Sequence, residues 1–223
     1  MPGFLRRFLF LTTALIFLTA SSLAQSPFQD TVEGFFASAF SSEYGDKDRT
    51  TLIRWETPLS VFVDGTPTAA DLAVLKNLFL ELKENVENLP AIAFTTVVEE
   101  ANVRFSFVPL KGMGKAVAGY EKGNWGFMTC YHQNGIISSG EAAVVCDKTT
   151  QEQRNHLIQE EFINMLGLCN DIDTFPQSII FDGWSASQSL APLDFEMLSL
   201  LYSPSLSPGM TAEEVREAFG GAS

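Results

Sequence analysis

The chain has 223 residues, of which 46% are hydrophobic and 18% are charged. This is enough for one domain with a sizeable core, and it excludes a disordered chain. The formal net charge is −13. Nucleic acids and anionic membrane surfaces are bound by clustered Lys and Arg, so this charge excludes both as expected partners.

The first 24 residues have the pattern of a secretory signal peptide. Arg6 and Arg7 form a basic start, residues 8–18 form an apolar run, and the small residues that follow place cleavage before Gln25. The apolar run falls short of the roughly 20 residues of a membrane-spanning helix, although an uncleaved N-terminal anchor is the alternative. We therefore expect a secreted or periplasmic protein with no transmembrane segment after signal cleavage.

Three cysteines follow the signal peptide: Cys130, Cys146 and Cys169. An oxidising compartment permits one disulfide and leaves one thiol over. Cys130 and Cys146 flank an expected hairpin and are the preferred disulfide pair, although sequence alone does not fix the connectivity. Three cysteines also exclude a four-thiolate zinc site.

The first half of the chain has the signals of two helices and three strands. Residues 25–50 are interpreted as an N-terminal extension with a short amphipathic helix near residues 31–40. Alternating apolar residues predict a strand over 55–63, and apolar residues at helical spacing predict a helix over 70–88. Two further strands are predicted, over residues 92–98 and 102–108.

The second half begins with the glycine-rich segment 111–126, which lacks the Gly-Lys-Ser/Thr of a phosphate-binding loop and is expected to be a mobile loop. The turn signal Asn134-Gly135 predicts a hairpin of strands 126–132 and 136–146. A long helix is expected from Thr149 or Thr150 to Leu168. Two more helices should follow, over 190–202 and from residue 211. Because strands precede helices in this order, the sequence predicts an α+β fold.

The long helix carries a pattern close to that of a zinc-protease active site. A zincin helix reads His-Glu-x-x-His-x-x-Gly, in which two histidines hold the metal and the Glu is the general base. Here Glu161 is at the base position and Gly167 at the glycine, whereas Glu160 and Asn164 replace the histidines. His156, Glu160 and Asn164 are spaced four residues apart and form one stripe along the helix.

The similarity continues beyond this helix. Metzincin peptidases follow it with Gly-Leu, a third metal ligand, a Ser-Ile-Met turn and a helix ending in Leu-Tyr; this chain has Gly167-Leu168, Asn170 at the ligand position, Ser178-Ile179-Ile180 and a similar helix over residues 190–202. The segment 151–202 thus resembles a metzincin active-site half. The resemblance implies a zincin, metzincin-like fold: a small twisted mixed sheet, an active-site-type helix and C-terminal helices.

The chain also resembles domain of unknown function 2927, a proteobacterial family of secreted proteins and lipoproteins. The shared features are a Glu-Glu-x-x-Gln-x-x-Gly-Leu-x-Asn-Asp block, from whose Gln Asn164 departs, and an ending like that of residues 201–210. This resemblance implies a Gram-negative bacterial source and carries no established function. We expect a metzincin-like domain over residues 51–204 and a tail with a short helix over 205–223.

The substituted site predicts altered metal use. Glu160, Asn164 and Asn170 offer only oxygen ligands, which favour calcium or magnesium over zinc, and Asp171 could add negative charge. His156 could supply one nitrogen, but it lies a turn before the usual ligand position. Zinc, calcium and no metal at all are therefore left open. Without a polarising metal, Glu161 has no acidified water to deprotonate.

These observations lead to three hypotheses of function. The first is a metallopeptidase-like protein with a degenerate, inactive site that binds a peptide, protein or envelope component in a cleft beside the edge strand, by strand addition. The second is an active metallopeptidase with unusual oxygen ligands and Glu161 as base. The third is a structural envelope protein stabilised by calcium.

Overall fold

The computed structural model describes residues 27–40, 50–183 and 187–220. The predicted signal peptide lies outside these residues. Within the described ranges, no helix is both long enough and apolar enough to cross a membrane.

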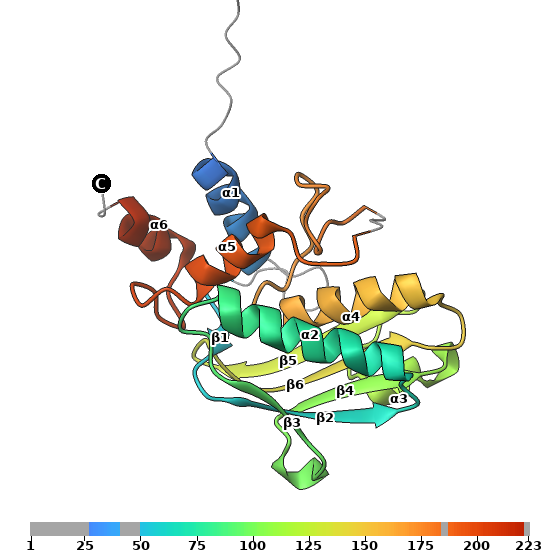
Figure 1. Cartoon of the computed structure of the whole chain (residues 1–223). Helices are drawn as coiled ribbons and strands as arrows, with labels where there is room; N and C mark the ends of the chain where they lie inside the picture. Colours follow the sequence, from blue (N-terminus) through green and yellow to red (C-terminus); the bar gives the residue numbers. More distant parts are fainter. Residues whose placement is uncertain (1–26, 41–49, 184–186, 221–223) are drawn as a thin grey trace, which may run out of the picture.

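The strands of the described residues form one six-stranded sheet, which is covered on one face by helices (Figure 1). Its strands are β1 (Arg54–Trp55), β2 (Leu59–Gly65), β3 (Ile92–Thr95), β4 (Val103–Val108), β5 (Gly126–Gln133) and β6 (Ile136–Val145). From β3 the order runs β2, β4, β6, all in parallel pairs, and β1 pairs in parallel with the first residues of β6. Only β5 is antiparallel, and it pairs with β6 alone among the described strands, so it forms one edge of the sheet.

The described part of the chain also contains six α-helices. They are α1 (Pro27–Ala39), α2 (Ala69–Asn85), α3 (Met113–Ala116), α4 (Gln151–Met165), α5 (Pro192–Leu201) and α6 (Ala212–Gly220). Figure 1 shows α2 and α4 on one face of the sheet, with α1, α5 and α6 grouped at one end of the molecule. Two short 3-10 helices, η1 (Val98–Glu100) and η2 (Leu110–Gly112), complete the structure.

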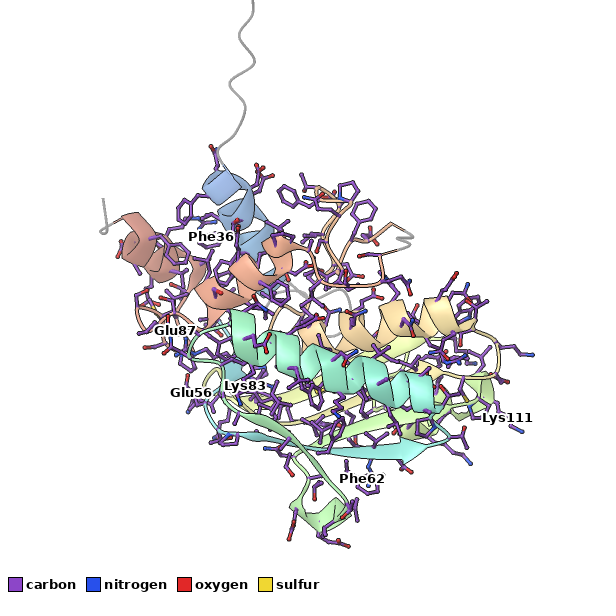
Figure 2. The ribbon with its side chains drawn as sticks, in the orientation of Figure 1. Phe36, Glu56, Phe62, Lys83, Glu87 and Lys111 are labelled. Carbon is purple, nitrogen blue, oxygen red and sulfur yellow. The ribbon has the colours of Figure 1, made fainter. Side chains whose placement is uncertain are left out.

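The sequence fixes α2 and α4 at their starts and along one face. Thr68 and Thr150 each form a capping box with the residue three positions on, which satisfies exposed N–H groups of the first turn. Phe79 of α2 then packs on Phe162 of α4, with ring centroids 4.9 Å apart. On the sheet, Phe62 of β2 points to the face away from both helices (Figure 2).

The helices at the two ends of the chain share one apolar cluster. Phe35 of α1 lies 5.9 Å from Phe219 of α6 between ring centroids. Gly34 lets α1 approach α5 closely, since a Cβ atom there would lie 2.9 Å from Met197 Sδ. The described part of the predicted N-terminal extension is therefore a packed helix that shares the main core.

The predicted elements are present, with three differences. The strand expected over 55–63 is divided into β1 and β2, with Pro58, which has no N–H to donate, between them. The glycine-rich segment contains the short helices η2 and α3. In the sequence, helix α2 comes between the strands β2 and β3, which pair in parallel, so strands and helices alternate in this part of the chain. The mixed α+β class is confirmed, and the zincin fold stays a prediction.

Candidate functional site

A cleft of about 510 Å³ lies between the edge strand β5 and helix α4. Its walls include residues from both elements, from the segment before β5, and from the loop after α4. Of the residues predicted for the site, Glu160, Glu161, Asn164 and Asp171 line this cleft. The glycine-rich segment contributes Trp125, so it forms part of the cleft wall as well.

Side chains from distant segments hold the last turn of α4, where the carbonyl groups have no partner within the helix. Trp55 Nε1 and Cys130 Sγ donate to Met165 O, at 3.0 and 3.3 Å. Tyr202 Oη donates to Leu166 O at 2.9 Å. Gly167 then turns the chain at φ +124°, where a Cβ atom would overlap the carbonyl oxygen of Ile53. These contacts fix the end of α4 relative to β1, β5 and α5.

Glu161, at the general-base position, lies directly against Gly126 at the start of β5. A Cβ atom at Gly126 would overlap Glu161 Oε1 and would lie 3.0 Å from both Cγ and Cδ. Glu161 is 8% exposed. Glycine at position 126 therefore gives this carboxylate its place beneath the edge strand.

Asn164 has an unsatisfied acceptor within the cleft wall. The residue is 8% exposed, and its Nδ2 donates to Asp171 Oδ1 at 3.3 Å. Its Oδ1 is buried and accepts no hydrogen bond. Burying an unpaired polar atom costs about 1–3 kcal/mol, so this oxygen is a place where a bound donor would be stabilised.

His156 does not line the cleft; it orients Glu160 from behind. Its Nε2 lies 3.4 Å from Glu160 Oε2, and its Nδ1 lies 3.1 Å from the carbonyl oxygen of Ser187. Burial lowers the pKa of His156, and the contact with Ser187 opposes this shift only in part. The two contacts fix the imidazole, which makes His156 a positioning residue for the Glu160 carboxylate.

Asn170, the predicted third ligand, does not line the cleft. Its Nδ2 donates to Ala37 O of α1 at 3.3 Å and to Asp171 O at 2.7 Å. Asn170 therefore connects the loop after α4 to the N-terminal helix, a contact that no motif in the sequence indicates. Asn170 is thus not among the residues that line the cleft, and its role as a metal ligand stays a prediction.

Asp182 lines the cleft and was missed by the sequence reasoning. A parallel bridge between Ile172 and Phe181 brings it there, with Asp182 N donating to Ile172 O at 3.0 Å. The same bridge places Asp182 close to the backbone that follows Asp171. No periodicity or motif marks Asp182, because its position depends on a pairing between two irregular segments.

A fully buried carboxylate, Asp194, holds the turn that resembles the metzincin Ser-Ile-Met turn. It accepts hydrogen bonds from Ser178 Oγ at 2.5 Å, Ile179 N at 3.1 Å and Ala191 N at 2.7 Å. Burial raises the pKa of Asp194, and these hydrogen bonds oppose the shift. The carboxylate therefore fixes both the turn and the start of α5, which follow the acidic loop.

The predicted disulfide between Cys130 and Cys146 is wrong. Cys130 lies opposite Gly140 in the hairpin, and Cys146 is six residues further along (146 − 140). At about 3.3 Å per residue this is a separation near 20 Å, whereas the Cα atoms of a disulfide lie within about 7 Å. Neither these two cysteines nor Cys169 forms a disulfide in the structure.

Residues 29–220 match the model of a family described as protein of unknown function (DUF2927). The chain belongs to the DUF2927 family. The resemblance to this family that the sequence analysis identified is therefore confirmed for most of the chain.

The solved structures that are similar to the DUF2927 protein include two of myroilysin. One is 13% identical with a TM-score of 0.42, and the match covers 69% of this chain and 97% of that chain. The other is 14% identical with a TM-score of 0.44, over 81% of this chain and 97% of that chain. No curated protein matched the sequence.

The predicted metal ligands of the DUF2927 protein do not fit a metal ion well. Within the described ranges, no three His, Cys, Asp or Glu side chains are grouped so that they could hold one ion. Asn170 is directed to α1, and Glu161 is confined beneath Gly126. Metal ligands must lie about 2.0–2.6 Å from a common centre, and no three His, Cys, Asp or Glu side chains of the described ranges are grouped to meet that condition.

Proposed function

We propose that this DUF2927 protein is an exported, peptidase-like protein that binds an extended peptide segment without cleaving it. The segment lies in the cleft between β5 and α4 and pairs with β5 by strand addition. Export to the periplasm or beyond rests on the signal-peptide pattern of residues 1–24. The peptide comes from a protein or another component of the cell envelope.

The edge strand β5 is the observation that carries this proposal. Along β5, the backbone N–H and C=O groups of successive residues point alternately toward β6 and away from it. The hydrogen bond from Val145 N to Trp125 O shows that the backbone groups of Trp125 point toward β6. By that alternation Gly126, Met128 and Cys130 direct their backbone N–H and C=O groups away from β6. All three line the cleft, so an extended chain placed there meets a row of main-chain groups at the spacing of a strand.

The absence of cleavage in this proposal is supported by the positions of the former catalytic groups. Hydrolysis by a zincin requires a metal that acidifies water beside the base. In the described ranges no three His, Cys, Asp or Glu side chains are grouped around one centre, and Glu161 is packed against Gly126. The cleft thus keeps the walls that hold a peptide, whereas its donor set does not support water activation.

A backbone N-methyl scan tests strand addition. A peptide selected from a synthetic library for binding would be remade with one N-methyl group at each position in turn. We expect affinity to fall about tenfold or more at alternate positions, because only every second N–H pairs with β5. Strand addition would be contradicted if N-methylation changed the affinity at no position, or lowered it at consecutive positions.

Metal content tests the claim that the protein does not cleave its ligand. Protein purified without an affinity tag is analysed by mass spectrometry, as wild type and as the Glu160→Ala, Asn164→Ala double variant. We expect no stoichiometric metal in either. Near-stoichiometric zinc that is lost in the double variant, together with cleavage of the selected peptide, would replace this proposal with an active metallopeptidase.

A further inference from the structure

The cleft has a strongly acidic lining. Glu160, Glu161, Asp171 and Asp182 all contribute to its wall, and none of the described residues that line it is Lys or Arg. Opposite charges attract more strongly in a partly enclosed site than in bulk water. This lining favours a ligand that carries positive charge.

The buried oxygen of Asn164 indicates which kind of positively charged ligand the cleft binds. Its Oδ1 accepts no hydrogen bond, while its Nδ2 is already used as a donor to Asp171. The residue is 8% exposed and belongs to the cleft wall. An acceptor in this position is satisfied by an N–H group, so the unpaired oxygen points to a hydrogen-bond donor and the acidic lining to a positive charge.

An organic cation fits this wall better than a metal ion does. A metal ion needs several ligands around one centre, and no such group of acidic, His or Cys side chains is present in the described residues. A lysine ammonium has three N–H donors and an arginine guanidinium has five, and these reach acceptors that are spread along a wall. Dispersed carboxylates therefore suit a side-chain cation.

An aromatic side chain adds a second element of recognition. Trp125 lines the same cleft as the carboxylates. The face of an aromatic ring attracts ammonium and guanidinium groups, and it also packs against the methylene stem of Lys or Arg.

We infer that the cleft selects extended peptides through a Lys or Arg side chain, which Asn164 and the surrounding carboxylates bind in the place where a zincin would hold its metal. This inference rests on the proposed peptide-binding function and names its ligand class. Main-chain pairing with β5 supplies a sequence-independent part of the affinity, and the basic side chain supplies the selectivity.

Matched peptide pools test the inference. Each pool is a degenerate hexapeptide mixture, acetylated and amidated at its ends, with Lys, Arg, citrulline, norleucine or Glu fixed at one central position. Binding to the full mature protein is measured by fluorescence anisotropy at low and moderate salt. We expect the Lys and Arg pools to bind at least tenfold more tightly than citrulline and norleucine, and this ratio to shrink as salt rises.

The outcomes separate the two proposals. Equal binding of the citrulline, norleucine and basic pools would overturn selection of a cation and leave peptide binding in place. If no pool binds at any salt concentration, both the peptide-binding function and this inference are wrong. Blocked peptide ends ensure that a preference for Lys or Arg reports the side chain and not a terminal amine.

Single substitutions test which residues of the cleft bind the basic side chain. Asn164→Leu should reduce the preference for the basic pools by about tenfold, the typical effect of losing one hydrogen bond to a charged group. Glu99→Gln, in the exposed helix η1, is the matched control and should leave the preference unchanged. Circular dichroism confirms that each variant is folded. If folded Asn164→Leu protein keeps the full preference for the Lys and Arg pools, Asn164 does not bind the basic side chain.

Discussion

The two ends of helix α4 treat buried polar groups in opposite ways. At its start, Arg154 donates to Asp71 at 3.0 Å, to Gln151 at 2.7 Å and to Thr149 O at 3.0 Å, so a buried charge pair is fully hydrogen bonded. At its end, Asn164 keeps a buried oxygen without a partner. One helix thus combines an end organised for stability with an end organised for a ligand.

The largest expected effect on stability comes from disrupting the buried Arg154–Asp71 pair at the start of α4. Asp71→Asn would leave the Arg154 guanidinium buried without its counter-charge, and removal of one partner of a buried pair costs about 3–5 kcal/mol. Urea denaturation measures the loss. The exposed Arg104–Asp64 pair, with its charged atoms 3.7 Å apart, is the control, and Asp64→Asn should change stability by less than about 1 kcal/mol. Similar losses of stability in the two variants would mean that the buried pair contributes no more than the exposed one.

Acid should weaken the same end by a smaller amount, because protonation leaves the side chain in place. Burial raises the pKa of Asp71, but hydrogen bonds from Thr68, Gln151 and Arg154 outweigh it and hold the pKa below its usual value. Stability from Asp71 is thus complete above about pH 4 and is lost as pH falls through the folded-state pKa. Urea titrations at several pH values should show a shallower acid loss in Asp71→Asn.

Asp194 provides a check on the sign of this effect. Burial raises its pKa, so its contribution falls as pH rises from about 4 toward the folded-state pKa. Asp194→Asn should therefore steepen the acid loss relative to wild type, the opposite of Asp71→Asn. Parallel pH profiles for the two variants would contradict both assignments.

Gly126→Ala should destabilise the protein by about 1–3 kcal/mol, the usual cost of adding a methyl group to a tightly packed place. The added Cβ meets the Glu161 carboxylate. Glu161→Ala should remove most of this cost, so thermal denaturation of the two single variants and the double variant forms a cycle. Gly114→Ala, with its closest contact 3.7 Å away, is the control and should be nearly neutral. Additive effects of the two changes would refute the contact.

Asn164→Leu should alter the free energy of unfolding by no more than about 1 kcal/mol. Removal of an unpaired buried oxygen is favourable, and it offsets the lost hydrogen bond to Asp171. Urea denaturation compares this variant with Asn164→Ala, which leaves a cavity and should be less stable. A loss above about 2 kcal/mol in Asn164→Leu would mean that the oxygen has a stabilising role in the ligand-free protein.

Chelation should have the smallest effect. If no ion is held at the end of α4, excess EDTA should shift Tm by less than about 1 °C, since a bound ion would add a stabilisation that grows with its concentration. Differential scanning fluorimetry measures Tm before and after the addition of Ca²⁺ or Zn²⁺. A rise of several degrees with Ca²⁺ would favour the calcium-stabilised structural protein.

Much of the fold follows from local signals in the sequence. The Asn134-Gly135 pair predicts the hairpin, and both residues adopt the positive φ, 52° and 81°, that such turns require. Thr150 predicts the start of α4 through its capping box. The zincin-like motif also predicts a cleft between the edge strand and this helix, and Glu161 and Asn164 both line the cleft between β5 and α4.

The remaining parts of the site depend on contacts between distant segments. Asn170 is drawn to α1 by the carbonyl of Ala37, and Asp182 reaches the cleft through the Ile172–Phe181 bridge. Cysteine pairing likewise depends on the register of the hairpin, which places Cys130 opposite Gly140. None of these contacts leaves a periodic or local signature, so spacing along the chain does not predict them.

The hydrogen bonds that hold the last turn of α4 also set an order for folding. The donors Trp55, Cys130 and Tyr202 are separated from their acceptors by 110, 35 and 36 residues. Closing such long loops is slow compared with forming a helix. During folding, this turn stays incomplete until the segment that carries Tyr202 has joined it, so the acidic cleft depends on a segment that follows α4 in the sequence.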